Sequence, residues 1–282
     1  MADFGTPMLI GEGFNVMPVM IYSEFINEVG DQANFAAAMA AIMVVITSTI
    51  FLLQKYVVSR KSFTMSSLRP IETKEMTGAG NIIVHALIYL LVALSMIPQL
   101  VVVYTSFLET RGAVFTGGYS LESYTTIFSS LGTAISNTYL YSTAAILVIV
   151  FLGMTVAYLT TRRKSALTDI IDTLTMFPYI IPGSVLGITL LLAFNEEPLL
   201  LSGTALIIII SLVIRRLPYT LRSSSAILYQ ISPSIEEASI SLGASPLKTF
   251  FKVTAIMMLP GVMSGAILSW ITAINELSSS VI

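Results

Sequence analysis

The sequence predicts an all-α protein that crosses a membrane several times. Only 11% of its 282 residues are charged, whereas a water-soluble domain carries about 25%. Hydrophobic residues make up 55% of the chain, and its mean hydropathy is +0.86. Several stretches without Asp, Glu, Lys or Arg are also long enough to span a bilayer, which takes roughly 20 apolar residues.

Six such stretches are the predicted transmembrane helices. They are Ala33–Leu53, Ile82–Leu108, Ala134–Thr160, Thr173–Asn195, Pro198–Ile214 and Val253–Asn275. The fifth stretch is short and could be extended only by including Arg215 and Arg216. Since an arginine at the centre of a span costs about 2.5–3.5 kcal/mol on insertion scales, we expect both at the membrane interface.

The basic residues predict the orientation. Of the 14 Lys and Arg residues, 13 lie in the first, third and fifth connections: Lys55, Arg60, Lys61, Arg69, Lys74, Arg162, Arg163, Lys164, Arg215, Arg216, Arg222, Lys248 and Lys252. By the positive-inside rule these connections are cytoplasmic, including residues 215–252. The N-terminus, residues 109–133 and the "NEEP" turn are then expected outside.

The composition excludes several classes of chemistry. There are no cysteines, so disulfides and thiolate sites are excluded, and one histidine leaves little material for imidazole catalysis. A membrane-embedded enzyme would need clustered His, Ser-His or paired acids within its spans, and the sequence has none. The net charge of −2 gives no reason to expect nucleic acid. A G-x-x-x-x-G-K-[ST] loop is also missing, so we expect no ATP site and no bound cofactor in this chain.

The polar stretch "ISPSIEEASISLGASPLKTFFK" at 231–252 predicts two short amphipathic helices. Each Ser-Pro pair, at 232–233 and 245–246, suits an N-cap followed by the first helical residue. Gly243 suits a left-handed stop between the helices. We expect the helices at Pro233–Leu242 and Pro246–Ala255. Such a segment is either a membrane-surface connector or a docking element for a cytoplasmic partner.

A family resemblance favours docking. The letters EAS at 237–239, followed by Gly243, resemble the E-A-A-x-x-x-G loop of the permease subunits of binding-protein-dependent ABC importers. Val253 and Pro260-Gly261 match further positions, whereas the family's Leu-Pro is replaced by Ala255-Ile256. The resemblance implies the type I ABC-importer permease fold, with this loop coupled to a nucleotide-binding ATPase subunit. The implied coupling residues are Glu236, Glu237, Ala238, Gly243, Leu247 and Phe250.

The two ends of the sequence are alike. "ADFGTPMLI" at 2–10 can be aligned with "NELSSSVI" at 275–282, which pairs Asp3 with Glu276. This arrangement resembles the fused permeases of ferric-iron importers, which carry two related halves. It implies that residues 1–54 are the tail of a first half with one transmembrane helix, 55–80 a cytoplasmic linker, and 81–282 a second half without its last helix. A chance similarity is the alternative.

The stretch "FPYIIPGSVLG" indicates a broken helix within the fourth span. Each proline removes a helix hydrogen bond, and interrupted membrane helices are tolerated where backbone is buried in protein or lines a cavity. Acids at membrane depth are also candidates for function. The pore candidates are therefore Tyr179, Pro182, Gly183, Ser184, Asp3 and Glu276. A packing kink and solvated helix ends are the alternatives.

The resemblance implies the permease subunit of an ATP-driven importer in the cytoplasmic (inner) membrane, for ferric iron delivered by an external substrate-binding protein. Its partners would be the ATPase subunit, which hydrolyses ATP, the extracytoplasmic binding protein, a second permease half and the lipid bilayer. Related permeases carry thiamine, polyamines, sulfate or phosphonates. A non-transporting membrane fragment or scaffold is a further alternative. No metal site is expected in the chain itself.

Overall fold

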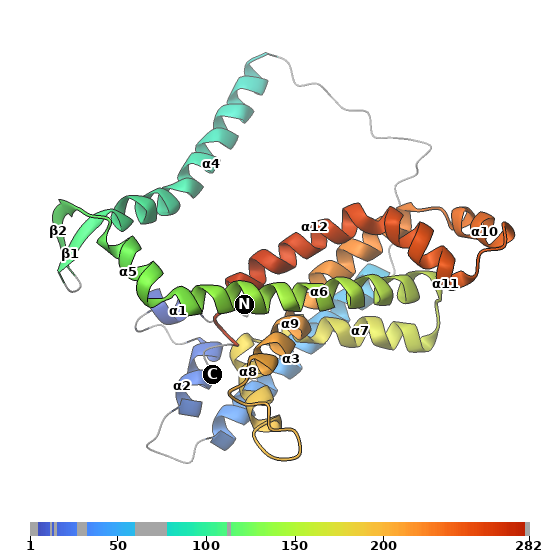
Figure 1. Cartoon of the computed structure of the whole chain (residues 1–282), viewed down its shortest axis with the longest axis horizontal. Helices are drawn as coiled ribbons and strands as arrows, with labels where there is room; N and C mark the ends of the chain where they lie inside the picture. Colours follow the sequence, from blue (N-terminus) through green and yellow to red (C-terminus); the bar gives the residue numbers. More distant parts are fainter. Residues whose placement is uncertain are drawn as a thin grey trace. The chain divides into compact units, whose positions relative to one another are not determined.

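A computed structural model describes residues 5–11, 13, 16–26, 33–59, 78–111 and 114–279 (Figure 1). The elements are α1 Gly5–Ile10, α2 Met17–Ile26, α3 Ala33–Ser59, α4 Ala79–Ser106, β1 Leu108–Arg111, β2 Val114–Tyr119, α5 Glu122–Ser130, α6 Gly132–Arg162, α7 Ala166–Ile180, α8 Gly183–Ala193, α9 Ala205–Gln230, α10 Pro233–Ser241, α11 Pro246–Thr249, the π-helical turn η1 Phe250–Thr254, and α12 Ala255–Ile274. The chain forms two compact units, residues 1–60 with 137–282 and residues 61–136. Most of the predicted linker at 55–80 lies outside the described residues.

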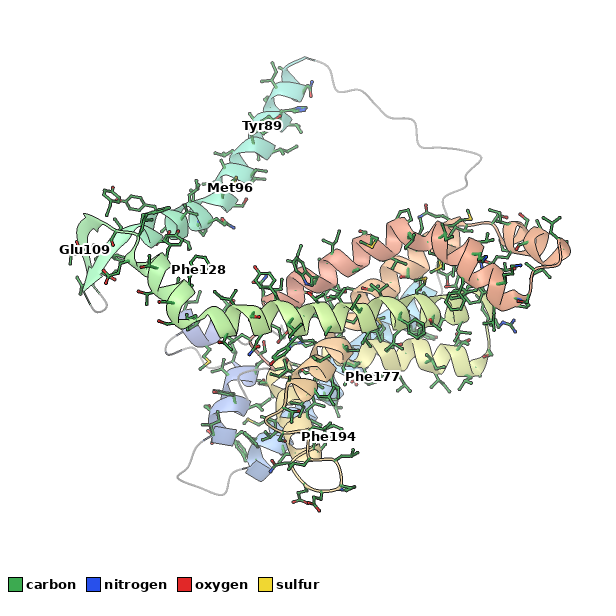
Figure 2. All side chains as sticks on the ribbon, viewed as in Figure 1. Tyr89, Met96, Glu109, Phe128, Phe177 and Phe194 are labelled. Carbon is green, nitrogen blue, oxygen red and sulfur yellow. The ribbon has the colours of Figure 1, made fainter. Side chains whose placement is uncertain are left out.

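The smaller unit contains one long apolar helix and a β-hairpin. Side chains of α4 such as Tyr89 and Met96 project away from the helix, and none of its side chains is buried (Figure 2). After α4, strands β1 and β2 pair antiparallel, with Arg111 opposite Val114. This hairpin was not predicted, so the chain is not purely α-helical. Its sequence, "VFTGGY" in β2, contains the aromatic and β-branched residues that favour strands.

Close packing of α9 against α12 forms the centre of the larger unit. Small residues allow the approach, because a Cβ added to Gly265 would lie 2.7 Å from the Cα of Thr220. Hydroxyl groups then bond across the contact: Thr220 Oγ1 and Ser269 Oγ are 2.8 Å apart, and Ser223 Oγ donates to the Gly261 carbonyl at 2.6 Å. Small and hydroxyl-bearing residues at a helix contact are typical of membrane helices, where apolar burial gives no advantage over lipid.

Helix α6 crosses this pair at another glycine. A Cβ on Gly153 would lie 3.1 Å from Cγ2 of Thr220, so α6 and α9 nearly touch there. Around the crossing, residues of α6, α9 and α12 form one buried apolar cluster that includes Ala157, Leu221, Met258 and Val262. Three helices from distant parts of the sequence thus share one core.

Helix length and composition mark four candidate spans in the described part of the chain. They are Phe35–Val57, Ala79–Ser106, Gly132–Arg162 and Pro246–Ile274. The bent pair α7–α8 could form a fifth. The predicted count of six is therefore not reproduced by this criterion, and two predicted spans differ from the structure.

The fourth predicted span is two helices that meet at 107°. Helix α7 contains Pro178 and ends at Ile180, and Pro182 precedes α8. Ile181 between them is extended, with φ −75° and ψ 133°. A proline disfavours the helical conformation of the residue before it, so the break falls where the second proline stands.

The fifth predicted span has the wrong bounds. Helix α9 begins at Ala205 rather than Pro198 and continues through Arg215 and Arg216 to Gln230. The arginines therefore lie inside a 26-residue helix instead of at its end. Both arginines pair with Glu276 in the structure.

We predict that Gly265→Ala destabilises the protein by about 1–3 kcal/mol. The new methyl group would overlap backbone of α9, which cannot rotate away, and this outweighs the gain in helix propensity of about 1 kcal/mol. Thermal unfolding of the purified protein in detergent would measure the effect. Gly132→Ala is the matched control, because a Cβ there meets nothing within 4 Å. Equal or greater stability of Gly265→Ala would contradict the packing described here.

Candidate functional site

A cavity of about 700 Å³ lies in the larger unit. We call it the central cavity. It is lined by Gly5 and Thr6 of α1, by Met43, Thr47, Ile50, Phe51 and Gln54 of α3, by Tyr179 and Ile180 of α7, by Arg215, Arg216 and Tyr219 of α9, and by Asn275, Glu276, Leu277 and Ser278 after α12. The α3 residues recur every three or four positions, so they form one face of that helix.

Glu276 and two arginines form the charged wall of the central cavity. The Glu276 side chain is only 2% exposed. Its Oε1 accepts hydrogen bonds from Arg215 Nη1 at 2.8 Å and from the backbone N–H of Ser279 at 3.2 Å, and its Oε2 pairs with Arg216 Nη2. Charges removed from water in this way are stable only when they are paired and hydrogen-bonded. The cluster therefore fixes the turn after α12 against α9.

The start of α8 lies directly behind this cluster. A Cβ on Gly183 would overlap the guanidinium group of Arg215 and the Cβ of Ser278. Pro182 beside it is almost completely buried. Only glycine leaves enough room at this position for the arginine, which explains why the helix break and the charged cluster occur together.

Further side-chain contacts join the helices that line the cavity. Tyr179 of α7 and Tyr219 of α9 meet edge to face, with their ring centroids 5.4 Å apart. On one side of them, Asp172 of α7 pairs with Lys55 of α3 at 3.3 Å and with Arg222 of α9 at 3.1 Å. These contacts connect α3, α7 and α9, the three helices that supply most of the cavity wall.

The structure brings together some of the predicted pore candidates. Tyr179 and Glu276 line the central cavity, and Pro182 and Gly183 support its wall. Ser184 is fully buried and donates to the Pro18 carbonyl of α2 at 3.2 Å, so it does not line the cavity.

The sixth candidate, Asp3, lies outside the described residues. Among the described residues, no three His, Cys, Asp or Glu side chains are grouped closely enough to hold a metal ion.

The sequence analysis missed the α9 side of the site. Arg215 and Arg216 were expected at the membrane interface, and Tyr219 was not considered. A charge-balance argument could have found them. Two arginines beside an apolar run require a buried acid, and Glu276 follows another apolar run.

The 231–252 segment has the predicted double cap. Ser232 Oγ accepts from the N–H of Ser234 at 3.4 Å, Ser245 Oγ accepts from the N–H of Lys248 at 3.3 Å, and Gly243 has φ +90°. The first helix, α10, ends one residue earlier than expected. The second does not end at Ala255, because α11 continues through η1 into α12 without a break.

The six predicted coupling residues fall into two groups. Glu237, Ala238, Gly243 and Leu247 are exposed on the surface of the larger unit. Glu236 and Phe250 are buried instead, and both contact α6. Glu236 was among the residues expected to contact the ATPase subunit, yet it is only 8% exposed. It points inward because Arg162 of α6 provides a partner for its carboxylate.

Part of the chain is similar to a known family of transport components. Residues 149–280 match the family "Binding-protein-dependent transport system inner membrane component". The chain is 27% identical over 288 residues to FbpB 1 of Haemophilus influenzae, which is named as a ferric transport system permease protein. That match covers 99% of this chain and 45% of the relative. FbpB of Actinobacillus pleuropneumoniae, a ferric transport system permease protein, is 27% identical over 290 residues, or 100% of this chain and 42% of the relative.

A third relative is named for different solutes. WtpB of Pyrococcus abyssi, a molybdate/tungstate transport system permease protein, is 29% identical over 149 residues, which are 53% of this chain and 59% of the relative. The chain spans less than half the length of the two FbpB relatives. The helices and the family together indicate a multi-pass protein of the inner membrane.

We predict that Tyr179→Cys is labelled by a small water-soluble thiol reagent, whereas Ser184→Cys is not. Tyr179 is 53% exposed and lines the central cavity, whereas Ser184 is 0% exposed. The natural chain has no cysteine, so each variant carries a single reactive thiol. Mass spectrometry of the labelled protein gives the readout. Rapid labelling of Ser184→Cys together with protection of Tyr179→Cys would show that the cavity is misplaced.

Proposed function

We propose that this chain forms the membrane pathway of an ATP-driven importer, because residues 149–280 match the family of binding-protein-dependent transport system inner membrane components. One observation carries the proposal. The exposed 231–252 segment connects α9 directly to α12, and the cavity wall includes Arg215 and Arg216 of α9 and Glu276 just after α12. A partner that moves the segment would therefore act on the wall of the central cavity.

The proposed topology has six crossings, formed by α3, α4, α6, the bent pair α7–α8, α9 and α12. Helix α9 has 26 residues and is about 39 Å long, enough to span a bilayer. Its two arginines are paired with Glu276, which lowers the cost of placing them at depth. With six crossings the basic connections alternate, so the positive-inside rule places 231–252 in the cytoplasm and the N-terminus outside.

The proposed pathway lies between two related halves. Residues 1–54 would come from one half and residues 81–282 from the other, with 55–80 as the linker between them. Both contribute to the central cavity, and α1 meets the turn after α12 there, since a Cβ on Gly5 would contact Cδ2 of Leu277 at 3.5 Å. These are the two segments that the sequence pairs, which supports the division.

The energy source in this proposal is a separate ATPase subunit. Its docking site would be the exposed surface of α10 and α11, where Leu242 is 89% and Leu247 is 72% exposed. Side chains of this kind can seat in a hydrophobic groove, and the exposed Glu237 beside them can pair with a basic residue of the partner. Nucleotide binding would then shift the population of inward-facing and outward-facing states through its different affinity for each.

We propose ferric iron, delivered by an external binding protein, as the transported solute. The support comes from the two FbpB relatives, because the similarity to them runs over essentially the whole chain rather than over the shared domain alone.

An oxyanion is the second candidate. The WtpB relative is named for molybdate and tungstate, and the central cavity presents two arginines, the side chain best suited to bind planar or tetrahedral oxyanions through paired hydrogen bonds.

We expect Glu237→Lys to abolish uptake while the protein still inserts into the membrane. The change reverses the charge of an exposed side chain, so we expect the fold to stay intact and only the partner contact to be lost. Uptake and co-purification of the ATPase subunit are the two measurements. Glu196→Lys, on the exposed turn before α9, is the matched control. Normal uptake in Glu237→Lys would refute the docking surface.

Cells that produce the complete transporter should accumulate radioactive ferric iron in preference to radioactive molybdate. If the solute is iron, excess molybdate will not compete, because the two solutes would be recognised by different external binding proteins. Cells without the permease gene give the background. Accumulation of molybdate and not of iron would reject the ferric assignment in favour of the oxyanion.

A further inference from the structure

Glu236 is a buried acid on α10, a helix whose other residues are mostly exposed. Its neighbours on α10 are solvent-exposed, yet this residue is only 8% exposed. A carboxylate is costly to bury unless strong partners compensate it, so its position calls for an explanation. The docking surface does not provide one, because Glu236 points away from that surface and toward α6.

Two residues at the end of α6 hold this carboxylate. Arg162 Nε donates to Glu236 Oε1 at 2.8 Å, and the Tyr158 hydroxyl donates to Oε2 at 3.1 Å. Tyr158 and Arg162 are four residues apart, so they lie on the same face of α6. The side chains of Arg162 and Glu236 are 13% and 11% exposed, which limits screening by water.

The same two α6 residues also hold the chain on either side of Glu236. Arg162 Nη2 donates to the carbonyl of Ile231, the residue that follows α9, at 2.8 Å. The Tyr158 ring packs on Phe250 at the start of η1, with centroids 4.7 Å apart. One face of α6 thus contacts the beginning, the middle and the end of the 231–252 segment.

Apart from these contacts, α10 packs on α11 and η1 of its own segment, where Ser239 Oγ and Thr249 Oγ1 are 3.0 Å apart. Ile231 and Ser232 are extended, and Gly243 takes a left-handed conformation, so both connections are sharp bends and not continuous helix. The lateral contacts to α6 prevent α10 from pivoting about these bends. Helix α6 is in turn packed on α9 at Gly153.

We propose that Tyr158, Arg162 and Glu236 form a clamp that makes the 231–252 segment and helix α6 move as one rigid body. This inference rests on the proposed function, and it assigns the three side chains a positioning role: they transmit the movement of a docked ATPase to the membrane helices without touching the ATPase. Glu237, one residue away, faces outward and serves the docking instead. The clamp therefore controls how much transport each ATP hydrolysed produces.

The test measures transport and ATP hydrolysis together in the assembled transporter, reconstituted in lipid vesicles with its ATPase subunit and binding protein. Glu236→Gln should retain ATPase binding and hydrolysis while transport per ATP falls by about ten-fold, a typical size for a coupling between sites. Glu196→Gln is the matched control, because it removes an exposed carboxylate that belongs neither to the clamp nor to the docking surface. If Glu236→Gln does not assemble, Arg162→Lys carries the same prediction, since lysine keeps the charge but cannot bond Glu236 and Ile231 together as the guanidinium does.

A cross-link provides a test that is independent of charge. The chain has no natural cysteine, so Arg162→Cys combined with Glu236→Cys can be bridged by a bifunctional maleimide. Bridging should restore transport per ATP, because the clamp acts mechanically. The clamp would be refuted if transport per ATP stayed at the wild-type value in Glu236→Gln or Arg162→Lys. It would also be refuted if bridging did not restore transport per ATP in the double variant. Hydrolysis without any transport by the wild-type complex would instead reject the proposed function, and the clamp with it.

Discussion

The paired charges of Glu276, Arg215 and Arg216 are the constraint on which the larger unit depends. A helix that carries two guanidinium groups through apolar surroundings is stable only if an acid meets them there, and Glu276 is almost completely buried against both. The pairing joins α9 to the turn after α12. Behind it, Gly183 leaves the space for Arg215. The same three side chains form part of the cavity wall.

A second structural feature is the close approach of α6 and α12 to α9. Glycines at 153, 261 and 265 remove the side chains that would hold α6 and α12 away from α9, and hydroxyl groups bond across the contacts. A tightly packed trio of helices can transmit a displacement at its end to the cavity, because well-packed interiors do not deform continuously. In the proposed mechanism Glu236 holds the 231–252 segment against α6. Its neighbour Glu237 faces outward, toward the docked ATPase subunit.

Local patterns predicted local structure well. The double Ser-Pro caps, the turn at Gly243 and the helix break near Pro182 are present, because capping, φ restrictions and missing donors act within a few residues. The π-helical turn at Phe250–Thr254 and the hairpin after α4 were not foreseen. Hydrophobic periodicity does not distinguish a single π-helical turn from the α-helix that continues it. The hairpin lies within 108–119, most of which was assigned only to an outside connection.

The sequence by itself determined the membrane class, four of the six expected spans, the capped segment and the acid at 276, since each depends on composition or on neighbours along the chain. Only the tertiary structure decided which partner each charge meets. Arg215 and Arg216 are 61 and 60 residues from Glu276 along the chain, and Arg162 is 74 residues from Glu236, so no local rule fixes such pairs. The physical reason is that the cost of a buried charge depends on what stands beside it in space. Because each has a partner, Arg215 and Arg216 can lie in the middle of a helix. For the same reason Glu236 can point inward while its neighbour Glu237 is exposed.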